Sequence, residues 1–185
     1  MRTTEAGESA LLLLDVLDLL AAAKASYAVV GALAASIHGA VRASMDADIL
    51  LSCGMPEAAN LERAFRAAGL QAMLTRGDVD DPIPGLLRLS DQYGNRVDLL
   101  LGLRGLESQA FSRLIDVPFQ GMMVKFIGRE DFIAMKAFAG GPLDLLDAAR
   151  AIAAAGETLD KPLLRRLAQA YGRDAAISLD RLLGA

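Results

Sequence analysis

The chain has 185 residues, of which 54% are hydrophobic and 23% charged. That composition excludes a disordered protein and fits one domain with a small helical appendage. The net charge of −4 excludes a global basic field for nonspecific nucleic-acid binding, so any RNA contact must be local. The single cysteine excludes a disulfide framework, and we expect a cytoplasmic protein.

The longest apolar stretch, 10–23, predicts an amphipathic helix of a soluble protein. Asp15 and Asp18 interrupt this stretch and, being three residues apart, share one helical face. A membrane span needs about 20 apolar residues without carboxylates. We therefore expect no membrane partner.

Short strands and helices alternate over the next hundred residues. A helix over 56–69 is indicated by Pro56 in its first turn and Gly69 at its end. The turn sequence Asp91–Asn95 predicts a hairpin between its two flanking apolar runs. We expect strands at 27–30, 47–51, 70–75, 86–89 and 96–101, and a short helix at 31–39.

A helix is predicted at 106–115 and a strand at 122–127. From residue 129 onward, the chain is predicted to be helical, with helices at 129–139, 143–155, 161–171 and 174–183. We expect an α/β core over 1–128 and a helical tail over 129–185 that packs on this core as one compact unit.

Three carboxylates stand where apolar strands are expected. Asp46 and Asp48 are two residues apart at the start of one strand, so they point to the same face, and Asp98 lies inside another. An unpaired carboxylate there costs several kcal/mol. If the strands are neighbours, the three converge, and Mg²⁺ or Mn²⁺ would relieve their repulsion. Alternatively, Asp46 caps a turn or pairs with Arg42, and Asp98 pairs with an arginine at position 88 or 96.

Gly31 lies directly between a predicted strand and a predicted helix. Its backbone N–H group can face an anion at the helix N-terminus, and the missing Cβ lets a phosphate approach. A tight turn alone would also explain this glycine. Together with the carboxylates, it predicts a phosphate site beside a metal site.

These motifs resemble the nucleotidyltransferase superfamily. Its signature is a strand, a glycine pair or Gly-Ser opening a helix, an Asp-x-Asp motif, and a third Asp on a later strand. This chain has Val30-Gly31-Ala32, then Asp46-Ala47-Asp48, then Asp98. Ala32 departs from the pattern and offers no hydroxyl to a phosphate.

A finer resemblance is to AbiEii-like toxins and related minimal nucleotidyltransferases. Glu130-Asp131 followed by Lys136 matches one motif of those proteins, and Asp144 with Asp147 matches a later one. Leu143 stands where a Lys is usual, and Ser44 replaces a Thr in the motif that precedes Asp46.

The resemblance implies a polymerase-β-like fold and a Mg²⁺- or Mn²⁺-dependent transfer of NMP from an NTP to an acceptor hydroxyl. The acceptor would be RNA, protein or a small molecule, and an antitoxin protein would be a partner. The resemblance implies that Asp46, Asp48 and Asp98 are catalytic metal ligands. It implies nucleotide-binding roles for Gly31, Ala32, Arg42, Ser44 and Lys136, and secondary roles for Asp144 and Asp147.

Plainer interpretations stay open. Lys136 can cover apolar core surface with its stem, and Asp144 and Asp147 can simply favour a helix N-terminus. A degenerate relative would bind a nucleotide or a partner protein without catalysis. A scaffold protein would pair its acidic strand ends with arginines.

Overall fold

The computed structural model describes residues 1–42 and 44–184. It divides into two compact units, one formed by Met1–Gly31 and Ala43–Arg104, the other by Ala32–Arg42 and Gly105–Ala185. The second unit therefore takes a short segment from within the part of the sequence that builds the first.

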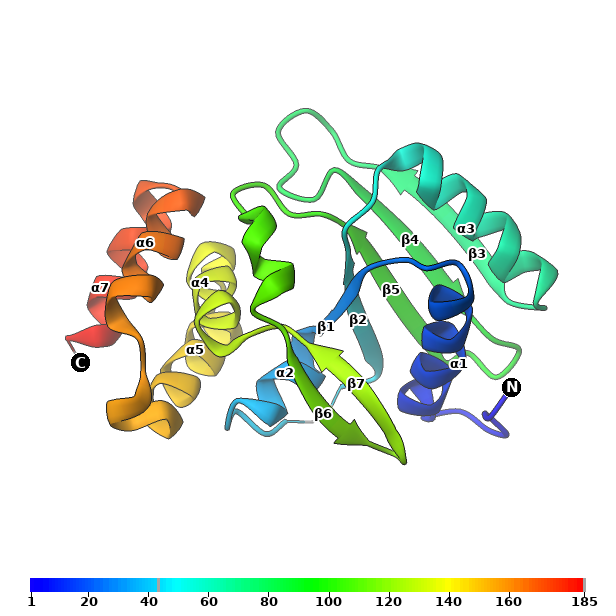
Figure 1. Cartoon of the computed structure of the whole chain (residues 1–185), viewed down its shortest axis with the longest axis horizontal. Helices are drawn as coiled ribbons and strands as arrows, with labels where there is room; N and C mark the ends of the chain where they lie inside the picture. The colour runs from blue at the N-terminus through cyan, green and yellow to red at the C-terminus, as the bar shows by residue number, and fades with distance from the viewer. Residues whose placement is uncertain (43, 185) are drawn as a thin grey trace. The chain divides into compact units, whose positions relative to one another are not determined.

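The first unit contains five strands of a mixed sheet (Figure 1). Its strands lie in the order β3-β4-β5-β2-β1, with β2 and β5 parallel and the other neighbours antiparallel. The strands are β1 (Tyr27–Val30), β2 (Asp46–Leu51), β3 (Gln71–Arg76), β4 (Gly85–Ser90) and β5 (Arg96–Leu101). The five strands predicted between residues 27 and 101 are all present, which confirms the mixed α/β class.

The two faces of this sheet differ because side chains alternate along each strand. Ile49, Val97 and Leu99 are fully buried and belong to the face against which α1 (Ser9–Ala22) and α3 (Met55–Ala67) pack. The opposite face carries charged side chains. The burial of one face fixes the register, because a slip of one residue would exchange the two sets.

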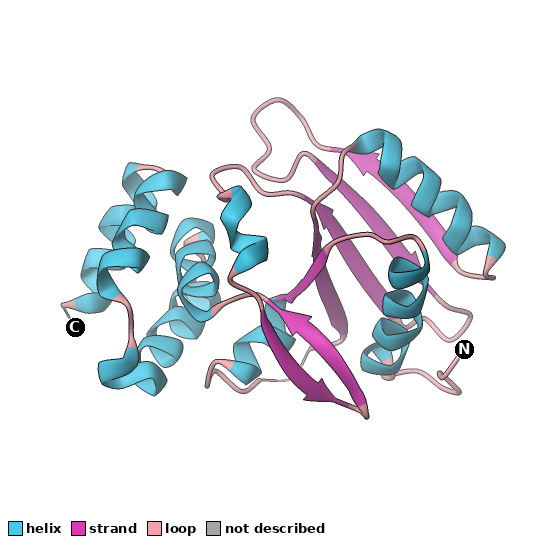
Figure 2. Ribbon diagram, in the orientation of Figure 1, coloured by secondary structure: helices cyan, strands magenta, loops and turns pink. Residues whose placement is uncertain are grey.

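The second unit combines a hairpin with helices (Figure 2). The hairpin consists of β6 (Ile115–Phe119) and β7 (Met122–Phe126). The helices are α4 (Arg129–Ala139), α5 (Pro142–Ala155), α6 (Lys161–Tyr171) and α7 (Arg173–Leu183), together with α2 (Gly31–Ile37) from Ala32 onward. Helix α4 contacts α5, α6 and α7 and contributes the buried Phe132 and Ile133 to their core. The four predicted tail helices are confirmed.

The prediction of a helix at 106–115 is wrong. The segment holds only a short 3-10 turn, η1 (Ser108–Ser112), and β6 begins at Ile115. The two residues between β6 and β7, Gln120 and Gly121, both have positive φ, at 47° and 81°. This is the backbone of a tight hairpin turn, and a glycine at the second position favours it.

None of the helices within residues 1–42 and 44–184 has the length and apolar character that crossing a bilayer requires.

Candidate functional site

The strand register puts the three predicted carboxylates on one face of the first unit's sheet. Asp48 lies opposite Asp98 in the parallel pair β2–β5, and Asp46 lies opposite Arg96. Arg88 on β4 lies opposite Asp98 from the other side. Because paired residues share a face, all five side chains stand on the face away from α1 and α3.

Two of these carboxylates contact arginines. Arg88 Nε donates to Asp98 Oδ1 at 3.1 Å, and Arg96 Nε lies 3.1 Å from Asp46 Oδ1. The hydrogen bond with Asp98 raises the pKa of Arg88 above its ordinary value. The arginine pairing considered for Asp98 is therefore present, whereas Asp46 pairs with Arg96 in place of the Arg42 considered from the sequence.

Gly31 lies directly against Asp48. Its φ is +62°, and a Cβ at this position would come within 1.9 Å of Asp48 Oδ2. No L-residue with a side chain fits there without moving the carboxylate. The backbone therefore approaches a predicted metal ligand closely, and the role of Gly31 toward a phosphate stays a prediction.

Two serines organise the entry into β2. Ser44 Oγ donates to the carbonyl of Asp46 at 2.9 Å, so this hydroxyl is engaged with the backbone. Ser9 Oγ donates to Met45 O at 2.6 Å and accepts from Arg96 N at 3.1 Å. Ser9 thus ties the start of α1 to the starts of β2 and β5. Sequence reasoning missed Ser9, because only the fold brings it to these strands.

A second charged cluster lies within the other unit. Lys136 Nζ is 2.6 Å from Asp144 Oδ1 and 3.1 Å from Asp147 Oδ2, and Arg42 Nε is 3.2 Å from the same Asp147 oxygen. Asp147 is fully buried, and its Oδ1 has no hydrogen bond. Two cations thus compensate one buried carboxylate, so Asp147 is more than a favourable charge near a helix start.

The predicted site residues therefore fall into two groups, one in each unit. Ala32, in the second unit, is buried within α2 and offers a methyl group only. The first unit holds Gly31, Ser44, Asp46, Asp48 and Asp98, and the second unit holds Ala32, Arg42, Lys136, Asp144 and Asp147.

The first group contains side chains of the type that binds a hard divalent cation, but they are not gathered into an ion site. Three carboxylates on neighbouring strands supply the oxygen ligands that Mg²⁺ and Mn²⁺ prefer. Asp46 Oδ1 is buried without a hydrogen bond, although it forms an ion pair with Arg96. In the described part of the chain, no three His, Cys, Asp or Glu side chains are gathered closely enough to hold an ion.

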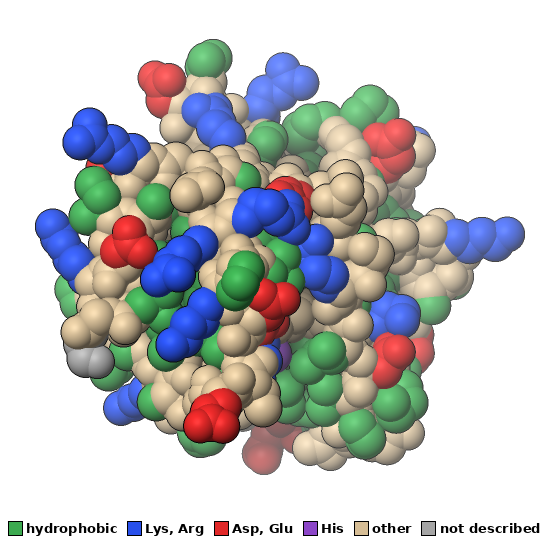
Figure 3. All heavy atoms as spheres, turned by 60° about the vertical axis from the view of Figure 1, so that its left-hand side comes forward, with side chains coloured by type: hydrophobic (Ala, Val, Ile, Leu, Met, Phe, Trp, Pro, Cys, Tyr) green, Lys and Arg blue, Asp and Glu red, His purple; other side chains and the backbone are tan. Residues whose placement is uncertain are grey.

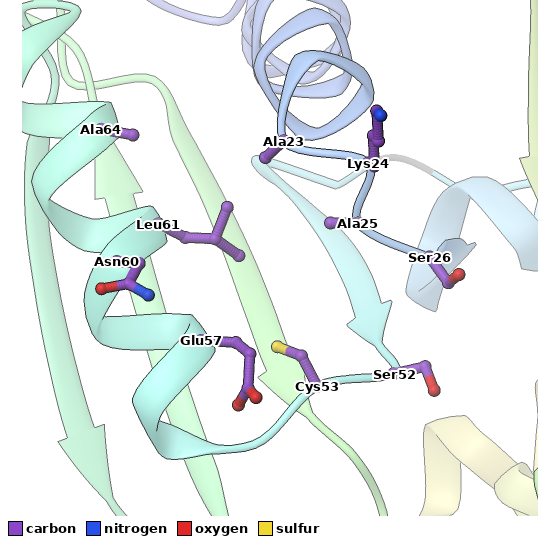
Figure 4. Close-up of a pocket in the computed structure, with 10 residues that line it drawn as sticks. All are labelled: Ala23, Lys24, Ala25, Ser26, Ser52, Cys53, Glu57, Asn60, Leu61 and Ala64. Carbon is purple, nitrogen blue, oxygen red and sulfur yellow. The ribbon is translucent and has the colours of Figure 1, made fainter.

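A hollow of about 480 Å³ lies at the other end of β2 (Figure 4). It is lined by the chain between α1 and β1, by Ser52 and Cys53, and by α3, and it contains none of the predicted site residues. Burial and the nearby charge of Glu57 raise the pKa of the Cys53 thiol. A raised pKa leaves less of the thiolate, which is the nucleophilic form, at neutral pH.

The chain matches no protein-family model and no curated protein in sequence. Solved structures do resemble it. The antibiotic-resistance factor ANT(2'')-Ia matches with a TM-score of 0.61 at 12% identity, over 94% of this chain and 95% of that one. A crystal structure of that protein holds adenylyl-2''-tobramycin.

Two further structures agree. A Thermotoga maritima protein designated a nucleotidyltransferase matches with a TM-score of 0.59 at 18% identity, over 74% and 88% of the two chains. The lincosamide antibiotic adenylyltransferase LnuA, with lincomycin bound, matches with a TM-score of 0.52 at 12% identity, over 80% of this chain and 98% of that one. The chain has the nucleotidyltransferase fold. This confirms the polymerase-β-like fold predicted from the sequence.

Proposed function

We propose that this protein is a divalent-metal-dependent nucleotidyltransferase that transfers NMP from an NTP to an acceptor hydroxyl. The observation that carries the proposal is the register of β2 against β5, which places Asp46, Asp48 and Asp98 on one face of a nucleotidyltransferase-type sheet. Carboxylates on adjacent strands of one face are what a metal and a triphosphate need.

Each carboxylate has a proposed role. Asp46 and Asp48 would hold the Mg²⁺ or Mn²⁺ that accompanies the triphosphate, while Asp98, opposite Asp48, would share the ion nearest the acceptor and help to take its hydroxyl proton. The bound ion supplies neutralisation of phosphate charge and a lower pKa for the hydroxyl. Gly31 keeps Asp48 in place, because no Cβ displaces its carboxylate.

A small hydroxylated molecule is the acceptor that the comparisons favour. A crystal structure of ANT(2'')-Ia holds adenylyl-2''-tobramycin, and that of LnuA holds lincomycin. An RNA acceptor has less support, since Lys and Arg side chains are spread among acidic and hydrophobic ones on the face drawn in Figure 3. Two tail arginines are also neutralised, Arg165 by Asp180 at 3.8 Å and Arg166 by Glu107.

Incubation of the protein with each labelled NTP, Mg²⁺ and fractionated lysate tests the proposal. Wild type should label an acceptor, and Asp48→Asn and Asp98→Asn should each lose transfer by roughly a hundredfold or more. Asp116→Asn is the matched control, because this exposed carboxylate on β6 pairs, among the described residues, with Lys125. If the two site variants label as fast as wild type, the proposal is wrong.

The two arginine pairs favour a second candidate, a nucleotide-binding module without catalysis. Arg88 and Arg96 already compensate Asp98 and Asp46, as they would in a site that has lost its metal. Such a module would raise its melting temperature with NTP yet label nothing. Saturation at a hundred times Kd would stabilise it by about 2.7 kcal/mol.

A toxin role, implied by the AbiEii-like resemblance, is a narrower form of the same proposal. It requires that induced expression of wild type arrests growth and that Asp48→Asn does not. Normal growth with both proteins, at equal expression, would remove the toxin role and leave nucleotidyl transfer untouched.

A further inference from the structure

We propose that the acceptor is a small hydroxylated molecule with an acidic group, a carboxylate or a phosphate, and that Arg88 and Arg96 recognise this group. This inference rests on the proposed function, because it names the acceptor of the same transfer. Such an acceptor has the opposite charge to the amino sugar tobramycin, whose adenylyl derivative a similar protein holds.

The strand register shows what lies beside Asp98. Strand β5 has β2 on one side, where Asp48 lies opposite Asp98, and β4 on the other side, where Arg88 does. One strand further out, Met73 on β3 lies opposite Arg88. The proposed function assigns the nucleotide to the β2 side of Asp98. An acceptor that reaches Asp98 from the other side therefore lies over β4 and β3.

The transfer itself requires this closeness. The acceptor oxygen bonds to the α-phosphorus, its proton passes to Asp98, and pyrophosphate leaves as its bond to that phosphorus breaks. The rest of the acceptor then has to lie on side chains next to Asp98, so these side chains determine which molecules are accepted.

The outer strands offer a surface that we call the shelf. Because side chains alternate along a strand, one face of β3 and β4 carries Gln71, Met73, Thr75, Leu86, Arg88 and Ser90. Arg96 on β5 borders the shelf, since it lies opposite Ser90. None of the six shelf residues is a carboxylate that could bind an ammonium group, whereas an amide and two hydroxyl groups suit a hydroxylated molecule.

Each arginine is the more exposed member of its ion pair. The Arg88 side chain is 44% exposed and that of Asp98 21%, and the values for Arg96 and Asp46 are 51% and 39%. Arg88 donates to Asp98 from Nε at 3.1 Å and from Nη2 at 3.4 Å. These bonds orient the guanidinium and do not use its Nη1 group, so donors remain for a carboxylate or phosphate on the acceptor.

An apolar strip lies beside the arginines. Leu86 lies opposite Leu100 on β5 and opposite Thr75 on β3, and both leucines are half-buried. The strip fits the apolar face of a ring, while Gln71 and Ser90, at the other side of Arg88, fit its hydroxyl groups. The shelf thus combines contacts for a ring, for hydroxyl groups and for an acidic group.

The charge of the acceptor tests the inference. The product that wild type labels in lysate is purified and cleaved with a phosphodiesterase, and the released acceptor is followed by mass spectrometry on ion-exchange columns at pH 7. We expect a small molecule that an anion exchanger retains. Phosphatase treatment removes this retention from a phosphate ester and leaves that of a carboxylate unchanged. An acceptor that is neutral, cationic, a protein or an RNA would overturn the inference.

Variants test the role of the arginines. Arg88→Gln and Arg96→Gln should each raise the KM for the purified acceptor roughly tenfold, as expected for the loss of one charge-assisted hydrogen bond, with little change in the KM for NTP. Arg88→Lys keeps the charge and should recover part of the loss. Arg76→Gln is the matched control. It removes a charge from the opposite face of the sheet, because Arg88 pairs with Met73, three residues away from Arg76.

The outcomes separate this inference from the proposed function. If an acceptor is labelled but Arg88→Gln and Arg96→Gln lower only kcat and leave its KM unchanged, the arginines do not recognise it. The inference is then wrong and the enzyme stands. If no NTP labels anything, the proposed function is wrong and the inference fails with it. Thermal melting of each variant shows whether it folds.

Discussion

Gly31 is the residue at which backbone conformation and site geometry meet. Its φ of +62° and the 1.9 Å that would separate an added Cβ from Asp48 Oδ2 both require glycine. We expect Gly31→Ala to lose about 1–2 kcal/mol from the left-handed backbone alone, and more from the displaced carboxylate. Urea unfolding measures the stability, and the melting shift with Mg²⁺ and NTP measures binding.

Gly69→Ala separates the two effects. Gly69 has a φ of +89°, but an added Cβ would meet nothing within 4 Å. This control should lose similar backbone stability and keep its full response to nucleotide. If Gly31→Ala keeps that response as well, Asp48 is not part of the nucleotide site.

At the same scale, the sequence identifies some site residues and not others. Asp46, Asp48 and Asp98 stand out because a carboxylate in an apolar strand conflicts with burial. Ser9 gives no such signal, since a serine near a helix start is ordinary, and only the family resemblance singled out Asp147. Their importance arises from partners distant in sequence, Met45 for Ser9 and Arg42 for Asp147.

Among the elements, β3 shows how the sheet ends. It is an edge strand, and edge strands expose backbone groups that can pair with another chain. Arg66 on α3 donates to Ala72 O from Nε at 3.0 Å and from Nη2 at 2.7 Å, and Glu62 Oε1 accepts from Leu74 N at 3.1 Å. The two side chains also pair with each other at 2.7 Å, so they close the edge.

Opening that edge should cause self-association. We expect Arg66→Ala and Glu62→Ala each to free one backbone group of β3 and to shift the protein toward oligomers at high concentration, as sedimentation velocity would show. Arg63→Ala is the control, because Arg63 on the same helix donates to the Asn60 side chain and not to β3 in the described part of the chain. Equal sedimentation of all three variants would mean that the edge is protected by other means.

Helices and strands were predicted well where the sequence has a clear hydrophobic periodicity or clear helix-capping residues. Helix α3 has proline near its start and a glycine after its end, and its predicted bounds are within two residues of those observed. The hairpin β6–β7 was only half predicted. Strand β6 is five residues long, contains Pro118 and alternates half-buried with exposed residues, so it carries little of the hydrophobic signal that identifies a strand.

At the scale of the whole molecule, the division into units could not be read from the sequence. The predicted boundary falls near residue 128, whereas the second unit takes up 32–42 and 105–128 together with the helices. Its contacts explain why. His38 Nε2 lies 2.9 Å from Ile127 O, and the His38 ring lies 5.2 Å from that of Phe132. No compositional change marks these segments as partners of the helical tail.

Cutting the chain after residue 128 tests whether the tail is independent. Residues 129–185 alone would leave Asp131, only 2% exposed, without the Arg113 that pairs with it at 2.6 Å. A buried carboxylate that loses its cation costs about 3–5 kcal/mol, a large part of the stability of so small a unit. We therefore expect 129–185 to lack a cooperative melting transition by circular dichroism.

Mixing the two pieces provides the control. The piece 1–128 contains Arg42 and Arg113, so adding it to 129–185 should restore the partners of Asp147 and Asp131 and with them a cooperative transition. Arg113→Gln in the 1–128 piece should weaken this recovery, because the forked pair with Asp131 cannot form. A tail that melts cooperatively by itself, at the temperature of the full chain, would instead establish residue 128 as a true domain boundary.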